Sequence, residues 1–413
     1  MQLGSHKQDI TPPHPITLAG FAHRKGKANK TFESLYLRSF LLKNNNSSFL
    51  FIVADLIWWD TRFVKKMKSK IEKEFEISGK QIVIHATHNH SGPQTSSSFS
   101  KQLGELDTSY LSFLEEKLMF SIKKLFLDLQ EVKMFVHSGT SQVGINRRKK
   151  LDNIIKMAPN TDGEVDDELK IYSFLNDSGQ KKAMWLHYTC HPTSTDENVI
   201  SSEFTGVCCK KLEETFPGCN VAYLQGYCGD IRPKLISNEE FYRGDIKDMV
   251  HLGNELFNDV MRLFKNSTAK ACRFVPFVFR EKEIPLTFGN ENITEIIPGK
   301  LKEEWPKLVD NNRNRSYTLI FQYVKISDLF EMVACNAELV NFYGSYIKDH
   351  NKNVIPLGYS NGMVGYIPTA KQLDEGGYEA EESIFYFGYP NKVNREMENQ
   401  IKDEMKKLIR GDV

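Results

Sequence analysis

A series of short apolar runs, several of which end beside an ionisable residue, most strongly constrains how this 413-residue chain folds. The runs are rich in β-branched and aromatic residues, and their length and composition predict buried β-strands. They are FLFIVAD (49–55), QIVIHAT (81–87), AMWLHYT (183–189), NVAYLQ (220–225), TLIFQYV (318–324), FEMVAC (330–335) and NVIPLGY (353–359). A chain with such strands has to bury most of its sheet.

Helical patterns alternate with these runs. Apolar residues recur at intervals of three and four over 111–129 and near 242–264, and the Lys- and Glu-rich stretch from about 392 to 410 resembles a C-terminal helix. The alternation predicts an α/β protein. Because no internal repeat or low-complexity linker divides the chain, we predict a single domain over 1–413, with 287–300 as the best candidate for an internal boundary.

Charge and composition narrow the class of protein. The 54 basic and 53 acidic residues give a net charge of +1, which argues against nucleic acid as the partner. The most apolar run, 49–59, is too short to span a membrane, and the N-terminus lacks a secretory signal. The seven cysteines show neither a disulfide framework nor paired CxxC spacing. We therefore predict a cytoplasmic protein; nothing in the sequence predicts an oligomeric state.

Residues able to perform chemistry follow the predicted strands. In open α/β sheets, ligands collect at the carboxyl ends of strands, so these residues are expected to converge. Two histidines from different strands and a carboxylate match a catalytic zinc site, which keeps one position open for water and lowers the pKa of that water. The candidates are His88, His90, His187, His191, Asp230, Glu338 and Tyr366.

Some of these positions also have a purely structural interpretation. His85 alternates within its strand and is expected to serve packing, and His187 is favoured as structural because its local pattern is that of a strand. Asp55 in an apolar run is expected to make buried hydrogen bonds. Glu338 begins an apolar periodic stretch, where a carboxylate can serve only the helix dipole.

Other hydrolase patterns fail. A metallo-β-lactamase-like site needs His-x-His-x-Asp-His, and Gly92 and Pro93 occupy its last two positions. The order of elements does not fit an amidohydrolase barrel, and neither a G-x-S-x-G elbow nor a Walker loop is present.

The ordered motifs, taken together, resemble those of the neutral, non-lysosomal ceramidases and their bacterial relatives. The segment ATHNHSGP resembles that family's A-[ST]-H-T-H-S-G-P zinc motif, and CGDIRP resembles its G-D-V-S-P segment. The matching segments are DITPP (9–13), LAGFA (18–22), 38–56, ATHNHSGP (86–93), GINRR (144–148), TCHPTS (189–194), CGDIRP (228–233), NAELVNFYG (336–344) and 365–390.

The resemblance implies a fold and a site. The expected fold is α/β, with mixed β-sheets sandwiched by helices and a metal site at the strand ends. The implied ligands of Zn²⁺ are His88, His191, Glu338 and Tyr366. His90, Arg147 and Tyr378 are implied as polar groups around the scissile bond, where they stabilise the oxyanion or protonate the leaving amine.

The sequence departs from the family pattern at positions that bear on the substrate. Arg232 replaces the serine of G-D-V-S-P, and arginine cannot act as a nucleophile but binds carboxylate or phosphate bidentately. Ala337 replaces a glycine, and neither a signal peptide nor the family's C-terminal β-sandwich domain is expected in this chain. We therefore predict a zinc-dependent amidase or deacylase that acts on a small-molecule N-acyl substrate, with Arg232 in its pocket. The alternatives are an ester or lactone hydrolase and a non-catalytic ligand-binding relative; ceramide itself is the less expected substrate.

Overall fold

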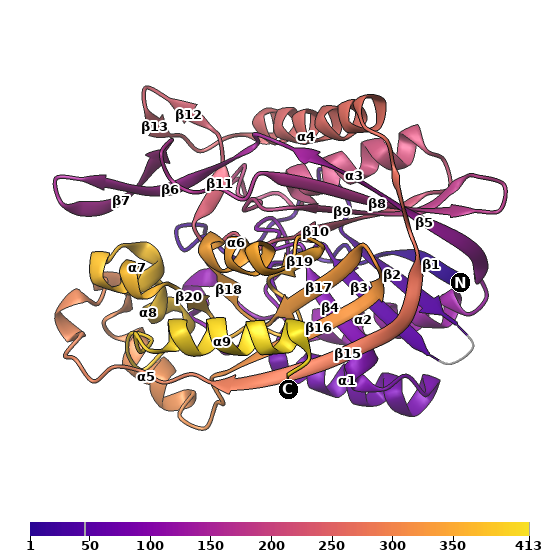
Figure 1. The fold of residues 1–413 in the computed structure, drawn as a ribbon. Coiled ribbons are helices and arrows are strands. Elements are labelled where there is room, and N and C mark those ends of the chain that lie inside the picture. Colours follow the sequence, from indigo (N-terminus) through magenta and orange to yellow (C-terminus); the bar gives the residue numbers. More distant parts are fainter. Residues whose placement is uncertain (45–46, 413) are drawn as a thin grey trace.

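The computed structural model describes residues 1–44 and 47–412. Two β-sheets face each other, and helices cover their outer faces (Figure 1). In spatial order the larger sheet contains β10 (Asn220–Gln225), β9 (Lys181–Tyr188), β8 (Glu168–Asn176), β5 (Gln130–Thr140), β1 (Gln2–Asp9), β2 (Tyr36–Lys43), β3 (Ser48–Ala54) and β4 (Ile82–Ala86), and β14 (Lys270–Cys272) also pairs with β5. The smaller sheet contains β15 (Phe274–Pro285), β16 (Thr318–Ser327), β17 (Phe330–Cys335) and β19 (Val354–Leu357). The expected α/β fold with mixed sheets sandwiched by helices is confirmed.

Short strands and helices complete the architecture. The short sheets pair β11 (Ile231–Pro233) with β6 (Gly144–Leu151) and β7 (Ile154–Asn160), β12 (Ile236–Ser237) with β13 (Glu240–Phe241), and β18 (Glu338–Leu339) with β20 (Tyr366–Ile367). The α-helices are α1 (Thr61–Phe75), α2 (Thr108–Leu125), α3 (Glu203–Thr215), α4 (Ile246–Asn266), α5 (Glu304–Asn311), α6 (Asn341–His350), α7 (Ala370–Glu375), α8 (Ser383–Phe387) and α9 (Met397–Arg410).

Alternation along each central strand builds the core. In β9, Trp185 faces the space between the two sheets, where it meets Phe330 of β17, while Met184 and Leu186 point to the opposite face. Helices α3 and α4 cover that opposite face and are seen at the top of Figure 1. Because both faces of these strands are buried, the strands read as continuous apolar runs.

Parallel pairs bring several strand ends to one region. Strand β4 runs parallel to β3, β10 to β9, and β19 to β17. Backbone hydrogen bonds then join the segments after these strands, from Gly358 to Gln225 at 3.2 Å and from Ala86 to Tyr359 at 3.1 Å. The polar residues that follow β4, β9 and β17 are thereby gathered from distant parts of the sequence.

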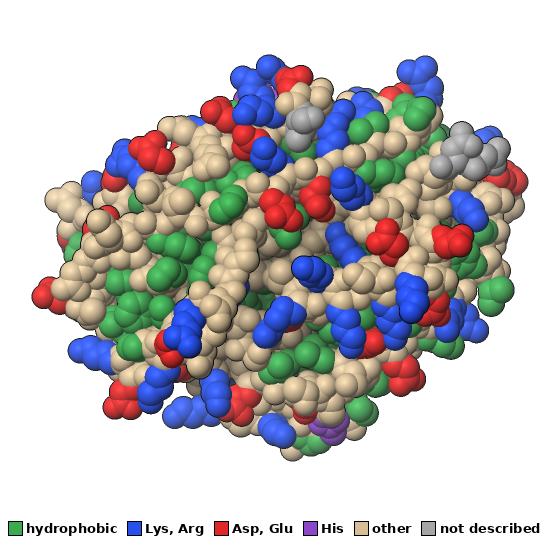
Figure 2. Space-filling model, turned by 90° about the horizontal axis from the view of Figure 1, so that it is seen from below, with side chains coloured by type: hydrophobic (Ala, Val, Ile, Leu, Met, Phe, Trp, Pro, Cys, Tyr) green, Lys and Arg blue, Asp and Glu red, His purple; other side chains and the backbone are tan. Residues whose placement is uncertain are grey.

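The surface and the cysteines fit the composition. On the face shown in Figure 2, basic and acidic side chains are interspersed. Every cysteine is a free, buried thiol. Within the described part of the chain, no helix combines the length and apolar character that crossing a membrane requires.

Candidate metal centre and pocket

His88 follows strand β4 in an unusual backbone conformation. Its φ is 64°, a left-handed value that is uncommon outside glycine and that marks functional positions. Its Nδ1 lies 2.9 Å from the carbonyl oxygen of Ile57. Because a carbonyl can only accept, Nδ1 carries the proton and Nε2 presents a lone pair. The ring stacks on Tyr359 with 3.8 Å between centroids, which fixes its plane.

His191 is oriented in the same way after strand β9. Its Nδ1 faces the carbonyl oxygens of Cys228 at 2.7 Å and Ile231 at 2.9 Å, so its Nε2 is also free to accept. Burial lowers the pKa of His191 to about 4, and the nearby carboxylate of Glu338 only partly opposes this effect. The imidazole is therefore neutral at physiological pH, as a metal ligand has to be.

Glu338 brings a buried carboxylate to these two nitrogens. Its Oε1 lies 2.7 Å from Nε2 of His191 and 3.4 Å from Nε2 of His88, and its side chain is 1 % exposed. Glu338 begins β18 rather than a helix, so it does not serve a helix dipole.

Tyr366 lies beside Glu338 and connects it to a buried arginine. The two residues are direct partners in the parallel pair of β18 and β20. The hydroxyl of Tyr366 accepts a hydrogen bond from Nη2 of Arg147 at 3.1 Å. Arg147 also donates from Nε to Glu379 at 2.8 Å, and its guanidinium lies 5.5 Å from the ring centroid of Tyr378. The predicted residues Arg147, Tyr366 and Tyr378 thus form one cluster.

His90 joins the same group of side chains. Its Nε2 lies 3.2 Å from Nε2 of His88, and ring nitrogens of His88, His90 and His191 all lie within 4.8 Å of one another. The family resemblance implied His90 as a polar group near the scissile bond, whereas its position also suits a third imidazole ligand.

The donor set fits a metal ion. The Nε2 atoms of His88 and His191 and Oε1 of Glu338 all carry lone pairs and face one another, and Oε1 receives no hydrogen bond from the described residues. Buried acceptors without a donor are costly, and a cation would satisfy all of them. Imidazole nitrogen and carboxylate oxygen are ligands of Zn²⁺ in catalytic sites and also suit other transition metals.

A cavity of about 280 Å³ opens onto this group. Its lining includes all the predicted polar residues, together with two of the predicted ligands: His90, Arg147, His191, Arg232, Tyr366 and Tyr378. A larger surface hollow of about 700 Å³ lies against α4 and is lined by none of the predicted residues. The smaller cavity is therefore the candidate substrate pocket.

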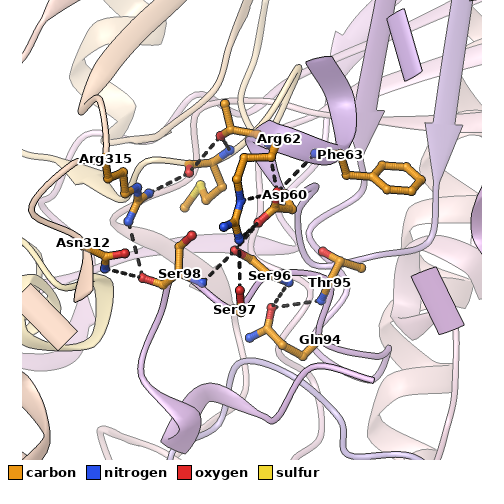
Figure 3. A network of polar contacts seen from close by, with 12 residues as sticks. Asp60, Arg62, Phe63, Gln94, Thr95, Ser96, Ser97, Ser98, Asn312 and Arg315 are labelled. Carbon is orange, nitrogen blue, oxygen red and sulfur yellow. Dashed lines mark hydrogen bonds and ion pairs between the residues drawn. The ribbon is translucent and has the colours of Figure 1, made fainter. Parts of the chain in front are cut away.

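The loop that follows His90 is held by a network of polar contacts (Figure 3). Ser96 donates to Asp60, the residue that caps α1, at 2.8 Å. Arg315 donates to the carbonyl of Ser98 at 3.5 Å and also to that of Met363 at 3.0 Å, in the loop before Tyr366. One arginine therefore supports the loops beside two site residues.

The other candidates from the sequence are structural. His85 bonds Ser360 and accepts the N–H of Gln225, and His187 contacts the carbonyl of Pro356. The carboxylate of Asp230 accepts the N–H of Asn341 at 2.7 Å. Asp55 pairs with Arg38, as expected for a buried carboxylate.

Sequence reasoning missed Glu379, the partner of Arg147. Its two carboxylate oxygens bind Arg147 and Arg148, and it lies in a π-helical turn, Tyr378–Glu382. The signal was present, because Glu379 belongs to the segment GYEAEES (377–383), which resembles a family motif. Its role was hidden because its partners lie far away along the chain.

Comparison with known proteins places this arrangement in context. The family model of the neutral/alkaline non-lysosomal ceramidase N-terminal region matches residues 1–239. The fold is similar to that of neutral ceramidase from Pseudomonas aeruginosa, with a TM-score of 0.77 and 15% sequence identity over 100% of this chain and 75% of that one. A ceramidase complexed with C2 gives a TM-score of 0.78, at the same identity and coverage. No curated protein sequence matches the chain.

Proposed function

The chain belongs to the neutral/alkaline non-lysosomal ceramidase family, and on this basis we propose that it is a zinc-dependent hydrolase that cleaves an N-acyl amide bond in a small polar substrate. The observation that carries the proposal is the convergence of Nε2 of His88, Nε2 of His191 and Oε1 of Glu338 in a buried site that opens onto a cavity. With the proton of each histidine on Nδ1, these three atoms face one another with lone pairs, and Oε1 of Glu338 has no hydrogen-bond donor among the described residues.

We assign His88, His191, Glu338 and Tyr366 as the residues that hold zinc. When bound, the ion supplies a Lewis acid that polarises the scissile carbonyl and lowers the pKa of the attacking water. The carbonyl oxygens of Ile57, Cys228 and Ile231 fix the proton of each histidine on Nδ1 and so keep Nε2 available.

We assign to Arg147 and Tyr378 the stabilisation of the negative charge that develops on the attacked carbonyl oxygen. Arg147 remains charged because burial, which lowers its pKa, is outweighed by Tyr366, Glu379 and Glu338. Burial raises the pKa of Tyr378, so its phenol keeps its proton and can donate a hydrogen bond. Donors that are oriented before the reaction stabilise such charge without reorganising. His90 is assigned to the leaving amine, to which it delivers the proton taken from water.

The test combines metal analysis with hydrolysis assays. Protein purified without a metal-affinity step should carry about one zinc per chain, and His191→Ala should lose it. His251→Ala is the matched control, because His251 is an exposed histidine on α4. Wild type should hydrolyse N-acyl compounds with polar amines. Absence of metal from wild type, or faster cleavage of long-chain ceramide than of every polar N-acyl compound, would contradict the proposal.

A further inference from the structure

Arg232 lies directly beside a residue that orients the candidate metal centre. It occupies the middle of β11, paired with Ile145 of β6. The carbonyl oxygen of the preceding residue, Ile231, lies 2.9 Å from Nδ1 of His191. Arg232 lines the same cavity as His90, His191 and Tyr366. Its side chain therefore lines the cavity beside the candidate metal centre.

Arg232 has no oxygen partner among the described residues. Its Nε is buried without a hydrogen bond, and Nη1 donates to the sulfur of Met157 at 3.9 Å. The guanidinium lies over the ring of Phe241, 4.4 Å from its centroid. Arg232 is half-buried, and a guanidinium with a buried, unbonded Nε and no carboxylate partner among the described residues indicates a partner that the chain itself does not supply.

Other arginines in the interior have the oxygen partners that Arg232 lacks among the described residues. Arg38 pairs with Asp55, and both Arg147 and Arg148 pair with Glu379. Arg315 donates to backbone carbonyls instead. Arg232 differs from all of these because it contacts a thioether and an aromatic ring, neither of which neutralises or strongly accepts from a guanidinium.

The rest of the cavity wall is also positively charged. Arg243 and Lys300 line it along with Arg147 and Arg232, whereas Asp196 is the acidic residue among its lining side chains. Asp196 already binds Arg243 and His23. Burial, Arg147 and Arg243 together lower the pKa of Arg232 to about 10. Arg147 and Arg243 each have a carboxylate partner, whereas Arg232 has none among the described residues.

From this geometry we propose that the substrate carries an oxyanion group, a carboxylate or a phosphate, which binds Arg232 in the cavity next to the scissile amide. The inference rests on the proposed function and narrows its substrate class to anionic N-acyl compounds. The planar guanidinium matches the two oxygens of either group in a bidentate pair. Lys300 adds long-range attraction at the wall of the cavity.

The test compares substrates that share an N-hexanoyl amide and differ in the charged or neutral group beyond it. N-hexanoylglycine, its neutral primary amide and N-hexanoyl-2-aminoethyl phosphate are assayed with the zinc-loaded enzyme. For wild type, kcat/KM for at least one anionic substrate should exceed that for the neutral amide by roughly 10- to 100-fold. The anionic substrate with the higher kcat/KM shows whether the site prefers a carboxylate or a phosphate. In Arg232→Met the ratio of kcat/KM for the anionic substrate to kcat/KM for the neutral amide should fall to about three or less. Arg232→Lys keeps the charge but loses the planar guanidinium, so its ratio should lie between those of wild type and Arg232→Met.

Controls separate this inference from the proposed function. Arg262→Met, at an exposed arginine of α4, should keep the wild-type ratio. Binding of N-hexanoylglycine and of its amide is also measured by calorimetry, because binding reports on the anion site even if no amide is cleaved. Preferential binding of the anion by wild type and its loss in Arg232→Met would support the anion site. Equal binding or cleavage of charged and neutral compounds by wild type, or an unchanged preference in Arg232→Met, would overturn it.

Discussion

Arg147 donates from Nε to Oε1 of Glu379 at 2.8 Å, and this buried contact joins residues 232 positions apart. The same carboxylate binds Arg148 through its other oxygen at 2.6 Å. Glu379 therefore pairs with two arginines and orients the one that contacts Tyr366.

Replacement of Glu379 by Gln should weaken both the fold and the reaction. It leaves the buried guanidinium of Arg147 without its carboxylate and Arg148 with only the longer contact to Glu375 at 3.5 Å, so the free energy of unfolding should fall by about 3–5 kcal/mol. Urea denaturation measures this loss. Asp374→Asn, which breaks an exposed pair with Arg395, is the control and should cost less than about 1 kcal/mol. Equal losses in the two variants would contradict the assignment.

Gly20→Ala should displace His90. A Cβ at Gly20 would lie 2.2 Å from Nδ1 of His90 and 2.7 Å from Cδ1 of Ile57. Hydrolysis should fall by about 10- to 100-fold, because small displacements of reacting groups are costly. Gly179→Ala is the matched control: Gly179 also has a positive φ but no atom within 4 Å of an added Cβ. Gly179→Ala should lose about 1 kcal/mol of stability and keep its activity. If Gly179→Ala also loses activity, backbone strain, and not displacement of His90, causes the loss in Gly20→Ala.

Arg315→Met should reduce metal affinity without touching a ligand. Arg315 donates to the carbonyls of Ser98, Met363 and Val364, and so holds loops on both sides of the site. The dissociation constant for zinc, measured by competition with a chelator, should rise by roughly 10- to 100-fold. The exposed Arg313 provides the control substitution, Arg313→Met. Unchanged zinc affinity in Arg315→Met would show that the loops hold their shape without this residue.

His90→Ala separates the two roles that its position allows. If His90 serves the leaving amine, as assigned, the variant should retain its zinc and lose kcat. If His90 is instead a third imidazole ligand, His90→Ala should lose its zinc, as expected for His191→Ala. Zinc content and kcat measured on the same sample distinguish these outcomes.

Asp230 should make stability depend on pH. Burial raises its pKa to about 6, while the N–H of Asn341 and the charges of Arg147 and Arg148 partly oppose this. The folded state therefore holds this proton more tightly than the unfolded state, and the contribution of Asp230 to stability falls as pH rises from about 4 to 6. The slope is up to about 1.4 kcal/mol per pH unit.

The measurement for Asp230 is the free energy of unfolding at several pH values for wild type and Asp230→Asn. The variant carries a constant penalty, because Gln372 also donates to this carboxylate at 3.0 Å. The slopes are therefore compared rather than the absolute values. Identical slopes below pH 6 would contradict the raised pKa.

Much of the fold could be predicted because its strands are buried on both faces. The apolar runs at 49–55 and 183–189 correspond to β3 and β9, and the repeat at 111–129 corresponds to much of α2. Helix α1 was not predicted, although Phe63, Val64, Met67 and Ile71 form its buried face. Helix α3 gave a weaker signal, because its sequence contains glycine, valine and two cysteines, which favour helix poorly.

The sequence by itself determined which residues follow the strands, and so identified His88, His191 and Glu338 as groups that could converge. Only the tertiary structure decided that His90 lies within reach of His88 as a further imidazole, that Glu379 pairs with Arg147, and that Arg232 has no carboxylate partner among the described residues. The physical reason is that hydrophobic periodicity is local and can be seen along the chain, whereas charge pairing depends on which strands and loops meet in space. An arginine has the same appearance in a sequence whether its partner is a glutamate far along the chain or a ligand that the chain has yet to bind.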